Sequence, residues 1–473
     1  MLHDIIMYGS AILAVVVVVY MLIKKMDIKI ALFLMGVVLL FISLAMGNTI
    51  AVTDFQSTGS ALFDPLQVIV DQFKSTLTSS GLIILMLGGY TAYMSSIGAN
   101  DVTVQVMTKP IGKIKSVYIL VPIVFLLGNL LSVVIPSAST LAILLLATLY
   151  PVLKRAGMST LSIAAIIATS ATIIPTPLGS DNVAIAGELA KHSQFANMTV
   201  TNYVFDYHAI VSIPTLLFIA LMHYFWQKRM DKKQLTQSEI ENVDLKEVKE
   251  IHGGKWFKTV YAILPIFPII LLLISFVLEL STGISVTVSV EISVLVSLVL
   301  AIICELIRNK GNKKVLADTE TFFKGMGNAI PIVALIVAAS VFVAGLQSIG
   351  LIEQLQASMQ HIQGDGFNFI LPLLMVLFTA LIVLLSGSGI ALFFAMVPLV
   401  VPLAAAAGIN PIALSVPMGI AGGLFRAVSP VAAVVLIIAG TLKIDPLAII
   451  KRTSVPMLAG VVFMFILSMI MYL

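Results

Sequence analysis

The sequence predicts an all-helical protein that crosses the membrane many times and consists of two inverted repeats. Three observations support this fold class. Of the 473 residues, 59% are hydrophobic and only 11% are charged. The charged residues cluster between apolar runs of roughly 18 residues or more, the length that spans a hydrocarbon core. Finally, features of the first half of the chain recur in the second half at a nearly constant offset.

Ten apolar segments are long enough to be spans. We expect them near residues 5–23, 29–47, 79–97, 160–190, 206–226, 257–278, 285–306, 328–350, 411–441 and 454–473. The first is too long for the core of a signal peptide and is not followed by a small-residue cleavage site, so we expect it to be retained. The single cysteine, Cys304, allows no internal disulfide and no zinc cluster, and no metal site is predicted.

Two pairs of shorter apolar segments are predicted to form re-entrant helical hairpins, which enter the membrane and return to the same side. The first hairpin covers 116–155 and the second covers 367–407, each turning at a short stretch of small residues. The tip residues are Ser137, Ala138, Ser139 and Thr140 in the first hairpin, and Ser386, Gly387, Ser388 and Gly389 in the second.

The basic residues predict the orientation, because short cytoplasmic loops collect Lys and Arg. Of the 27 basic residues, 24 fall on one side of the predicted topology, Lys74 and Lys191 fall on the other, and Arg426 lies inside a span. The 24 include Arg452 and the four basic residues of the run K-R-M-D-K-K at 228–233. We expect this run to be solvated in the cytoplasm. Both termini are therefore expected outside the cytoplasm. The first hairpin should open inward and the second outward.

The internal repeat divides the chain into repeat 1 at 1–226, a cytoplasmic linker at 227–256 and repeat 2 at 257–473. A shift of 252 aligns the pairs Ala92 with Ala344, Ser96 with Ser348 and Gly98 with Gly350, and a shift of 251 aligns Ser137 with Ser388 and Pro151 with Pro402. Each repeat contains five spans and a hairpin, and an odd number of spans inverts the second copy. Inverted repeats with broken helices are typical of secondary transporters.

One span in each repeat is interrupted by helix-breaking residues. The span at 160–190 contains P-T-P-L-G-S-D-N at 175–182, and the span at 411–441 contains G-G-L-F-R-A-V-S-P at 422–430. Non-helical backbone inside a membrane is tolerated only where it is buried in protein or lines a cavity. We therefore expect the two breaks and the two hairpin tips to meet near the middle of the membrane.

Candidate binding residues follow from this convergence. Helix N-termini and Arg426 favour an anion, so Arg426, Ser429 and the eight tip residues are the expected substrate site. Asp181, with Ser180 and Asn182, is the candidate site for a coupling Na⁺ or H⁺. Structural interpretations stay open: Arg426 could bond free carbonyls of its own break, Asp181 could cap the second half-helix, and the small tip residues could serve helix packing.

Several short motifs occur in order over some 400 residues and suggest a family. They are G-A-N-D at 98–101, S-A-S-T at 137–140, S-G-S-G at 386–389, G-I-N-P at 408–411, R-x-x-S-P at 426–430 and K-R-T-S-V-P at 451–456. Together they resemble the DcuC family of anaerobic C4-dicarboxylate carriers. The resemblance implies uptake, efflux or exchange of fumarate, succinate and malate across the bacterial inner membrane. It also implies a homodimer of elevator type, in which a transport unit slides along a fixed scaffold.

The sequence agrees with an elevator and also departs from the family pattern. The first two spans of each repeat are expected to be unbroken scaffold, with 99–115 and 308–326 as hinges. Gly422 and Gly423 stand where family members tend to have a Ser-Asn pair, and Ile390 stands where an Asn is expected. These differences remove polar groups from the expected site, so another carboxylate is an alternative substrate.

Other classes of protein fit less well. A membrane serine protease would need a histidine near Ser388, but only His208 and His223 lie on spans, both in the first repeat. No phosphate-binding G-x-x-x-x-G-K-[ST] motif occurs, so ATP is not expected to drive the protein. A sodium/proton antiporter that uses Asp181 is the main alternative, although it gives Arg426 no task. We thus expect no enzyme, no cofactor beyond a coupling ion, and a small dicarboxylate and the lipid bilayer as partners, with no nucleic acid.

Overall fold

The computed structural model describes residues 2–24, 26–52, 55–114, 116–233, 254–282, 288–354, 368–387 and 389–473. Within these ranges the chain is all-helical and has no strand. Eight of the described helical segments are long and apolar enough to cross a membrane. They are His3–Met21, Ile28–Ala45, Asp64–Ser96, Val200–Lys232, Lys255–Glu279, Val290–Arg308, Lys314–Ser348 and Pro446–Tyr472.

The first half of the chain contains two long helices, a bent span, a pair of shorter helices, a broken helix and a final long span. The elements are α1 (Leu2–Ile23), α2 (Ile28–Ala45), α3 (Asp64–Thr76), η1 (Leu77–Gly81), α4 (Leu82–Ser96), α5 (Ala99–Thr108), η2 (Lys109–Lys113), α6 (Val117–Leu131), α7 (Ala138–Thr148), α8 (Tyr150–Arg155), α9 (Thr160–Ala168), α10 (Ser180–Leu189), η3 (Ser193–Phe195), α11 (Val200–Asn202), η4 (Tyr203–His208) and α12 (Ala209–Lys233).

The second half follows a similar order. Its elements are α13 (Lys255–Ile263), η5 (Leu264–Ile266), α14 (Phe267–Thr282), α15 (Val290–Arg308), α16 (Lys314–Asp318), α17 (Glu320–Ser348), α19 (Ile370–Ser386), α20 (Gly389–Met396), η6 (Val397–Leu399), α21 (Val400–Ala407), α22 (Pro411–Arg426), α23 (Ala433–Leu442) and α24 (Pro446–Tyr472). The two predicted broken spans correspond to α9 with α10 and to α22 with α23.

Three predicted spans differ from the structure. The span expected at 79–97 begins at Asp64, because α3 carries several polar side chains that hide its helical pattern in the sequence. The span expected at 328–350 begins at Lys314. The span at 257–278, which we expected to be unbroken, changes to a 3-10 turn at Leu264–Ile266. The reason is Pro265, which has no backbone N–H to donate within a helix.

The prediction that the whole run at 228–233 is solvated does not hold at Met230, which is 7% exposed, or at Asp231, whose side chain is 13% exposed. Arg452 lies two turns into α24, its side chain is 1% exposed, and its Nη1 lies 2.6 Å from Oδ1 of Asp231 on α12. Ser159 and Ser162, at the start of α9, also donate hydrogen bonds to the Asp231 carboxylate. A buried arginine is tolerated here because it is paired and hydrogen-bonded.

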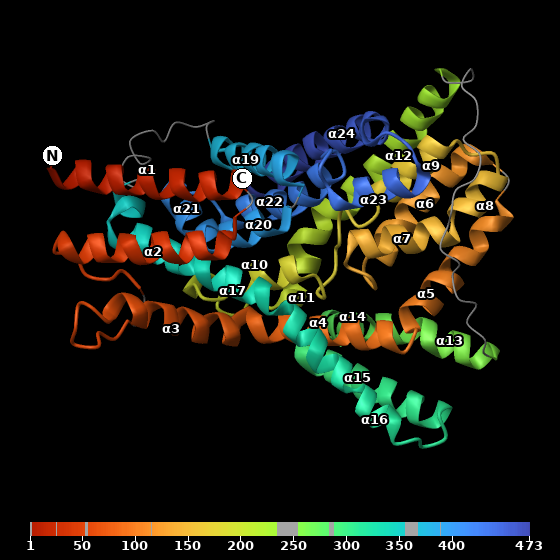
Figure 1. The fold of residues 1–473 in the computed structure, drawn as a ribbon, viewed down its shortest axis with the longest axis horizontal. Coiled ribbons are helices and arrows are strands. Elements are labelled where there is room, and N and C mark those ends of the chain that lie inside the picture. The colour runs from red at the N-terminus through yellow and green to blue at the C-terminus, as the bar shows by residue number, and fades with distance from the viewer. Residues whose placement is uncertain are drawn as a thin grey trace.

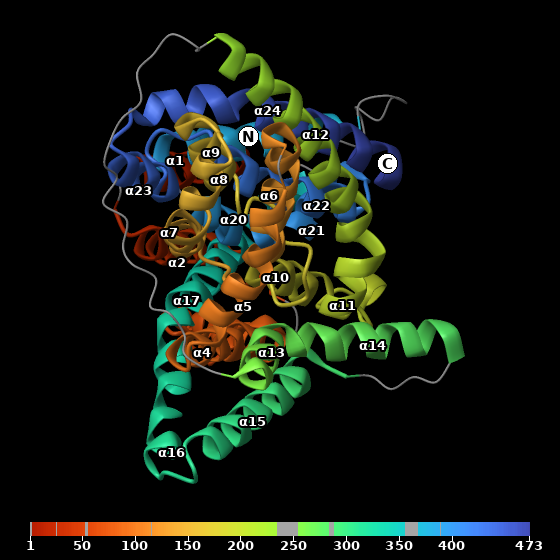
Figure 2. The same ribbon diagram turned by 90° about the vertical axis from the view of Figure 1, so that its right-hand side faces the viewer.

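The two pairs of shorter helices occupy different ends of the molecule. Figure 1 shows α6, α7 and α8 toward one end of the long axis, whereas α19, α20 and α21 lie toward the other end, where the N-terminus lies. One half of each broken helix, α10 and α22, contacts the other, and both contact α20. In the second view the α14, α15 and α16 region projects away from this central part (Figure 2).

The helix α17 joins the N-terminal helices of the chain through close backbone contacts. It packs against both α2 and α4. A Cβ atom on Gly36 would lie 2.8 Å from the backbone N of Phe342, and one on Gly325 would lie 2.6 Å from the carbonyl O of Gly88. Small residues permit such close helix packing in membranes. The elements α2, α4 and α17 therefore form one tightly packed group.

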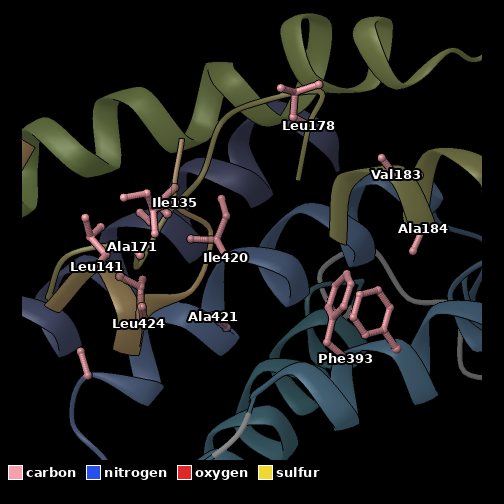
Figure 3. Close-up of a cluster of buried hydrophobic side chains, with 14 of the residues drawn as sticks. Ile135, Leu141, Ala171, Leu178, Val183, Ala184, Phe393, Ile420, Ala421 and Leu424 are labelled. Atoms are coloured by element: carbon pink, nitrogen blue, oxygen red, sulfur yellow. The ribbon is translucent and has the colours of Figure 1, made fainter. Parts of the chain in front are cut away.

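The central core connects the first hairpin to both broken helices. Figure 3 shows the side chains of Ile135 and Leu141, from the first hairpin, and Leu424, from α22, gathered around Ala171 in the first break. Phe393 of α20 lies along the same helix α22, which α20 contacts. All of these side chains belong to one buried hydrophobic cluster. The core thus brings parts of both halves together at the breaks.

Candidate functional site

The first break, residues 169–179, is held by an asparagine from the first hairpin. Asn129 on α6 is 2% exposed. Its Oδ1 accepts hydrogen bonds from the backbone N–H groups of Thr172 at 2.9 Å and Ile173 at 3.3 Å, and its Nδ2 donates to the carbonyl of Thr169 at 3.2 Å. One buried amide therefore satisfies backbone groups that the interrupted helix leaves without partners.

Asn182 completes the same break from its other end. It is 1% exposed in the first turn of α10, and its Nδ2 donates to the carbonyls of Ile174 at 3.1 Å and Thr176 at 3.0 Å. We predicted Asn182 as a coupling-ion ligand. In this structure its Nδ2 is bonded to backbone carbonyls, and the role of its Oδ1 as an ion ligand stays a prediction.

The second break, residues 427–432, lies against the second hairpin. Ser429 is fully buried and its hydroxyl donates to the carbonyl of Leu384 on α19 at 3.1 Å. Gly387 ends α19 with φ +73°, and a Cβ there would lie 2.5 Å from the carbonyl O of Val431. This position requires glycine because φ is positive and because a side chain would clash with the backbone of Val431. Ser429 and Gly387 therefore join the break to the hairpin tip.

Arg426 connects the two breaks. It is the last residue of α22, and its Nη2 donates a hydrogen bond to the carbonyl O of Ala171 in the first break. Ala171 has φ +58°, an uncommon conformation for a residue with a side chain. Arg426 thus bonds a carbonyl of the other half of the chain rather than one of its own break. Its Nε is buried and has no hydrogen-bond partner among the described residues.

A cavity of about 120 Å³ lies where these elements meet. Arg426 and Asp181 are half-buried residues in its wall, and their charges interact although they form no ion pair in the described structure. The cavity is lined by Pro136, Ala171, Thr172, Ile173, Ile174, Gly179, Ser180, Asp181, His208, Phe393, Phe394, Gly419, Ile420, Gly422, Gly423 and Arg426. Its wall therefore draws on both halves of the chain.

The chemistry of this cavity suits a small ligand with charge. It combines one guanidinium, one carboxylate and one imidazole with the apolar rings of Phe393 and Phe394. An apolar cavity of about 150 Å³ can hold a ligand the size of benzene, so a molecule of several heavy atoms is of the right order here. No group of three or more metal-ligating side chains occurs in the described ranges.

The structure brings only some of the predicted site residues together. Arg426, Asp181 and Ser180 line the cavity, and Asn182 lies beside it. Ser137 is exposed, and its Oγ caps α7 by accepting a hydrogen bond from the N–H of Thr140 at 3.3 Å. Of the other tip residues, Ala138, Ser139, Thr140, Ser386 and Gly387 do not line the cavity, and neither does Ser429. Ser388 lies outside the described residues.

Sequence reasoning missed four contributors. Asn129 is a single polar residue in the apolar run L-L-G-N-L-L. This signal could have been used, because a polar residue inside a span usually has a structural or functional role. His208 was noted only as a poor candidate for a base, yet it is 3% exposed and lines the cavity. Phe393 and Phe394 gave no signal in so apolar a sequence.

Comparison with known proteins identifies the family. The family model described as "C4-dicarboxylate anaerobic carrier" (DcuC) matches residues 7–473. The chain belongs to the DcuC family. It is 35% identical over 448 residues to the Escherichia coli (strain K12) protein named anaerobic C4-dicarboxylate transporter DcuC, covering 93% of this chain and 91% of the relative. It is also 35% identical over 441 residues to a Vibrio cholerae protein named as a probable transporter of the same kind, covering 92% and 91% of the two chains.

These relatives are transporters, so this DcuC protein is a membrane transport protein and not an enzyme. Two solved structures share its fold. The YdaH transporter of Alcanivorax borkumensis has a TM-score of 0.64 at 17% identity, with 93% of this chain and 98% of that chain covered. MtrF of Neisseria gonorrhoeae has a TM-score of 0.59 at 16% identity, with 93% and 94% covered. At this identity the likeness concerns the fold alone.

The geometry of the breaks also accounts for the glycine at position 423. A Cβ on Gly423 would lie 2.0 Å from the carbonyl O of Thr172. The closest atom belongs to the backbone, so moving it would cost considerable free energy. In this packing of α22 against the first break, residue 423 has to be glycine, and a serine or asparagine would need a different arrangement.

We predict that Gly423→Ala lowers the stability of the folded protein, by about 1–3 kcal/mol, because the added methyl group overpacks the contact with Thr172. Gly419→Ala is the matched control on the same helix, since its Cβ would lie 3.6 Å from the nearest side-chain atoms. Alanine there should be neutral or slightly stabilising. Thermal unfolding of both variants in detergent tests this prediction, and equal melting temperatures would contradict it.

Proposed function

We propose that this protein is a secondary carrier that moves C4-dicarboxylates such as fumarate, succinate and malate across the bacterial inner membrane. Membership of the family and the names of its relatives support the substrate class. The observation that carries the proposal is the position of Arg426, an arginine in the wall of a cavity where two broken helices meet. A charge at such a depth is costly and usually marks a transport pathway.

Arg426 can bind a carboxylate without giving up its structural bond. A guanidinium offers five N–H donors, and the structure uses one amino group for the carbonyl of Ala171. The remaining donors can hold one end of a dicarboxylate by charge-assisted hydrogen bonds. We place the other end toward the N-terminus of α10, where the N-cap residue is Gly179, which lines the cavity.

Asp181 supplies a physical basis for coupling in this proposal. Its carboxylate shares the cavity with Arg426 and opposes the entry of an anion. Binding of Na⁺ or H⁺ at Asp181 would cancel that negative charge and leave the field of Arg426 to attract the substrate. A sodium/proton antiporter would also use Asp181, but it would not need a dicarboxylate.

We also propose inverted repeats of 1–226 and 257–473 and an elevator motion. Each hairpin and broken helix packs into the central unit through contacts of α19 with α22 and of α23 with α7, while α2, α4 and α17 form the tight scaffold. The linker at 227–256 would lie in the cytoplasm and both termini outside. The resemblance to the DcuC family implies a homodimer of elevator type, and the two copies would associate through the scaffold.

We predict that Arg426→Lys impairs transport nearly as much as Arg426→Ala, since lysine cannot make two parallel hydrogen bonds to a carboxylate. Two charge-assisted bonds contribute about 1.5–3 kcal/mol each, so both variants should lower the rate of succinate counterflow in proteoliposomes at least about 100-fold. Normal exchange of succinate by Arg426→Ala would show that the arginine is structural only.

A binding measurement separates this loss from misfolding. Saturating succinate, at about 100 times its Kd, should stabilise the parent protein by about 2.7 kcal/mol. Arg426→Lys should still unfold cooperatively but should not be stabilised by succinate. Asp181→Asn, which removes the opposing charge and keeps the size of the side chain, should retain stabilisation by succinate. An antiporter without dicarboxylate affinity would show no succinate effect in any variant.

We predict that a cross-link between the first hairpin and the scaffold stops transport. Val134, after α6, and Met94, on α4, line the same small cavity of about 20 Å³. In a background with Cys304→Ser, the pair Val134→Cys and Met94→Cys would be joined by a short thiol-reactive cross-linker. The control pair is Leu40→Cys and Val341→Cys, which lies within the scaffold. Undiminished counterflow after complete cross-linking of the first pair would exclude the elevator motion.

A further inference from the structure

The π-helical turn η4 sets the direction of the His208 side chain. At its end, the backbone N–H of Ala209 donates to the carbonyl O of Val204, five residues earlier. In an α-helix, residues five positions apart point about 140° away from each other. In a π-helix they lie on the same side, and the rings of Tyr203 and His208 are accordingly 6.3 Å apart between centroids. The irregular turn therefore places His208 on the same face as Tyr203.

Tyr203 anchors this face against the second broken helix. Its side chain is fully buried, and its hydroxyl donates a hydrogen bond to Oγ of Ser415 on α22 at 3.4 Å. The turn η4 also contacts α10. These two half-helices carry Arg426 and Asp181, the charged residues of the cavity of about 120 Å³. His208 is thus held between them, and it lines the same cavity.

The imidazole of His208 is buried with an unused polar atom. The residue is 3% exposed, and its Nδ1 has no hydrogen-bond partner among the described residues. The Nε of Arg426, another residue of this cavity wall, is in the same state. Buried polar atoms in native proteins are nearly always paired. Two side chains that can donate hydrogen bonds therefore line one cavity with nitrogen atoms that the described protein leaves without partners.

The other polar side chains of the cavity wall are poorer partners for an anion. The hydroxyl of Thr172 already bonds acceptors in and beside the first break. An ionised Asp181 only accepts hydrogen bonds, and Ser180 offers a neutral hydroxyl. Among the lining residues that the structure describes, Arg426 and His208 are consequently the side chains that can carry positive charge.

We propose that His208 binds the second carboxylate of the substrate while Arg426 binds the first, and that His208 thereby selects dicarboxylates over monocarboxylates. The inference rests on the proposed function and deepens it, because it names the side chain that recognises the far end of the substrate. Gly179, the N-cap of α10, lines the same cavity, so the N–H groups at this helix end act on the same carboxylate.

The charges of the site agree with this assignment. A dicarboxylate brings two negative charges into a buried cavity, and a buried charge without a partner is costly. Arg426 provides a partner for one of them. For the other, a neutral imidazole of His208 provides one N–H donor, and a protonated imidazole provides two donors and a positive charge. In either state His208 can donate a charge-assisted hydrogen bond, which is roughly twice as strong as one between neutral groups.

The same arrangement gives the site a reason to reject monocarboxylates. Butyrate has the carbon-chain length of succinate, but it carries a methyl group in place of the second carboxylate. When bound by Arg426, butyrate would leave the imidazole of His208 unpaired beside that methyl group. A site built to hydrogen-bond one group of a substrate strongly rejects the analogue that lacks it. His208 would therefore act on the choice of substrate and not only on its affinity.

The test compares succinate with butyrate, because Arg426 would hold one carboxylate of either ligand. The succinate concentration that gives half-maximal counterflow in proteoliposomes measures the affinity for the dicarboxylate. Inhibition of this counterflow by butyrate measures the affinity for the monocarboxylate. The variants are His208→Leu, which removes both ring nitrogens, and His208→Gln, which keeps a neutral amide donor. Tyr207→Phe is the control, since Tyr207 is the neighbouring residue and does not line the cavity.

We expect His208→Leu to raise the succinate concentration at half-maximal counterflow at least about tenfold and to change the inhibition constant of butyrate less than about threefold. His208→Gln should lower the preference for succinate over butyrate at least about threefold, since its hydrogen bond carries no charge of its own. Tyr207→Phe should match the parent. Should His208→Leu fail to fold, His208→Gln decides alone.

Two results in the variants would overturn the inference. One is a parent-like preference for succinate in His208→Leu or His208→Gln. The other is an equal loss of affinity for both ligands, because it would give His208 a structural role. The parent protein separates this inference from the proposed function. A parent that binds butyrate as tightly as succinate would overturn the inference alone, whereas a parent without succinate counterflow would contradict the proposed function as well.

Discussion

The structure depends on how backbone groups are satisfied where two helices are broken inside an apolar core. Each unpaired N–H or C=O group buried in such surroundings costs several kcal/mol. The first break is held by Asn129 from the hairpin, by Asn182 from α10 and by Arg426 from the other half of the chain. The partners come from three different elements, so the break can exist only when these elements are assembled.

This requirement gives Arg426 two roles in our account. Its bond to Ala171 fixes the contact between the two halves, and its side chain forms part of the wall of the cavity at this contact. A carboxylate that binds there would act on the same side chain that holds the first break. Substrate binding and the packing of the two broken helices are then linked through one guanidinium, without any long pathway between sites.

Much of the fold could be predicted from the sequence because membrane spans carry a strong signal of length and composition. Proline, glycine and arginine in apolar runs marked both breaks. Boundaries failed where polar residues mask a helix, as in α3, and where Pro265 divides one. The burial of Arg452 was not predicted, because a charge count cannot distinguish a loop cation from one buried by a partner such as Asp231, which lies 221 residues away.

The site was only partly predictable for a similar reason. Arg426 and Asp181 stood out as charges inside spans, but the sequence did not reveal that the hydroxyl of Ser137 caps a helix. Local sequence cannot tell a cap from a ligand-binding group. His208 and Asn129 gain their roles from neighbours that lie far away along the chain, so only the folded arrangement reveals them.

The central claim is that Arg426 binds a substrate carboxylate in the cavity between the two breaks. The most direct measurement is an experimental structure of the purified protein with succinate, at a resolution that defines side chains. Our account predicts a carboxylate within hydrogen-bond distance of the Arg426 guanidinium, between α22 and the first break. Succinate bound elsewhere, with Arg426 contacting only the carbonyl of Ala171, would contradict it.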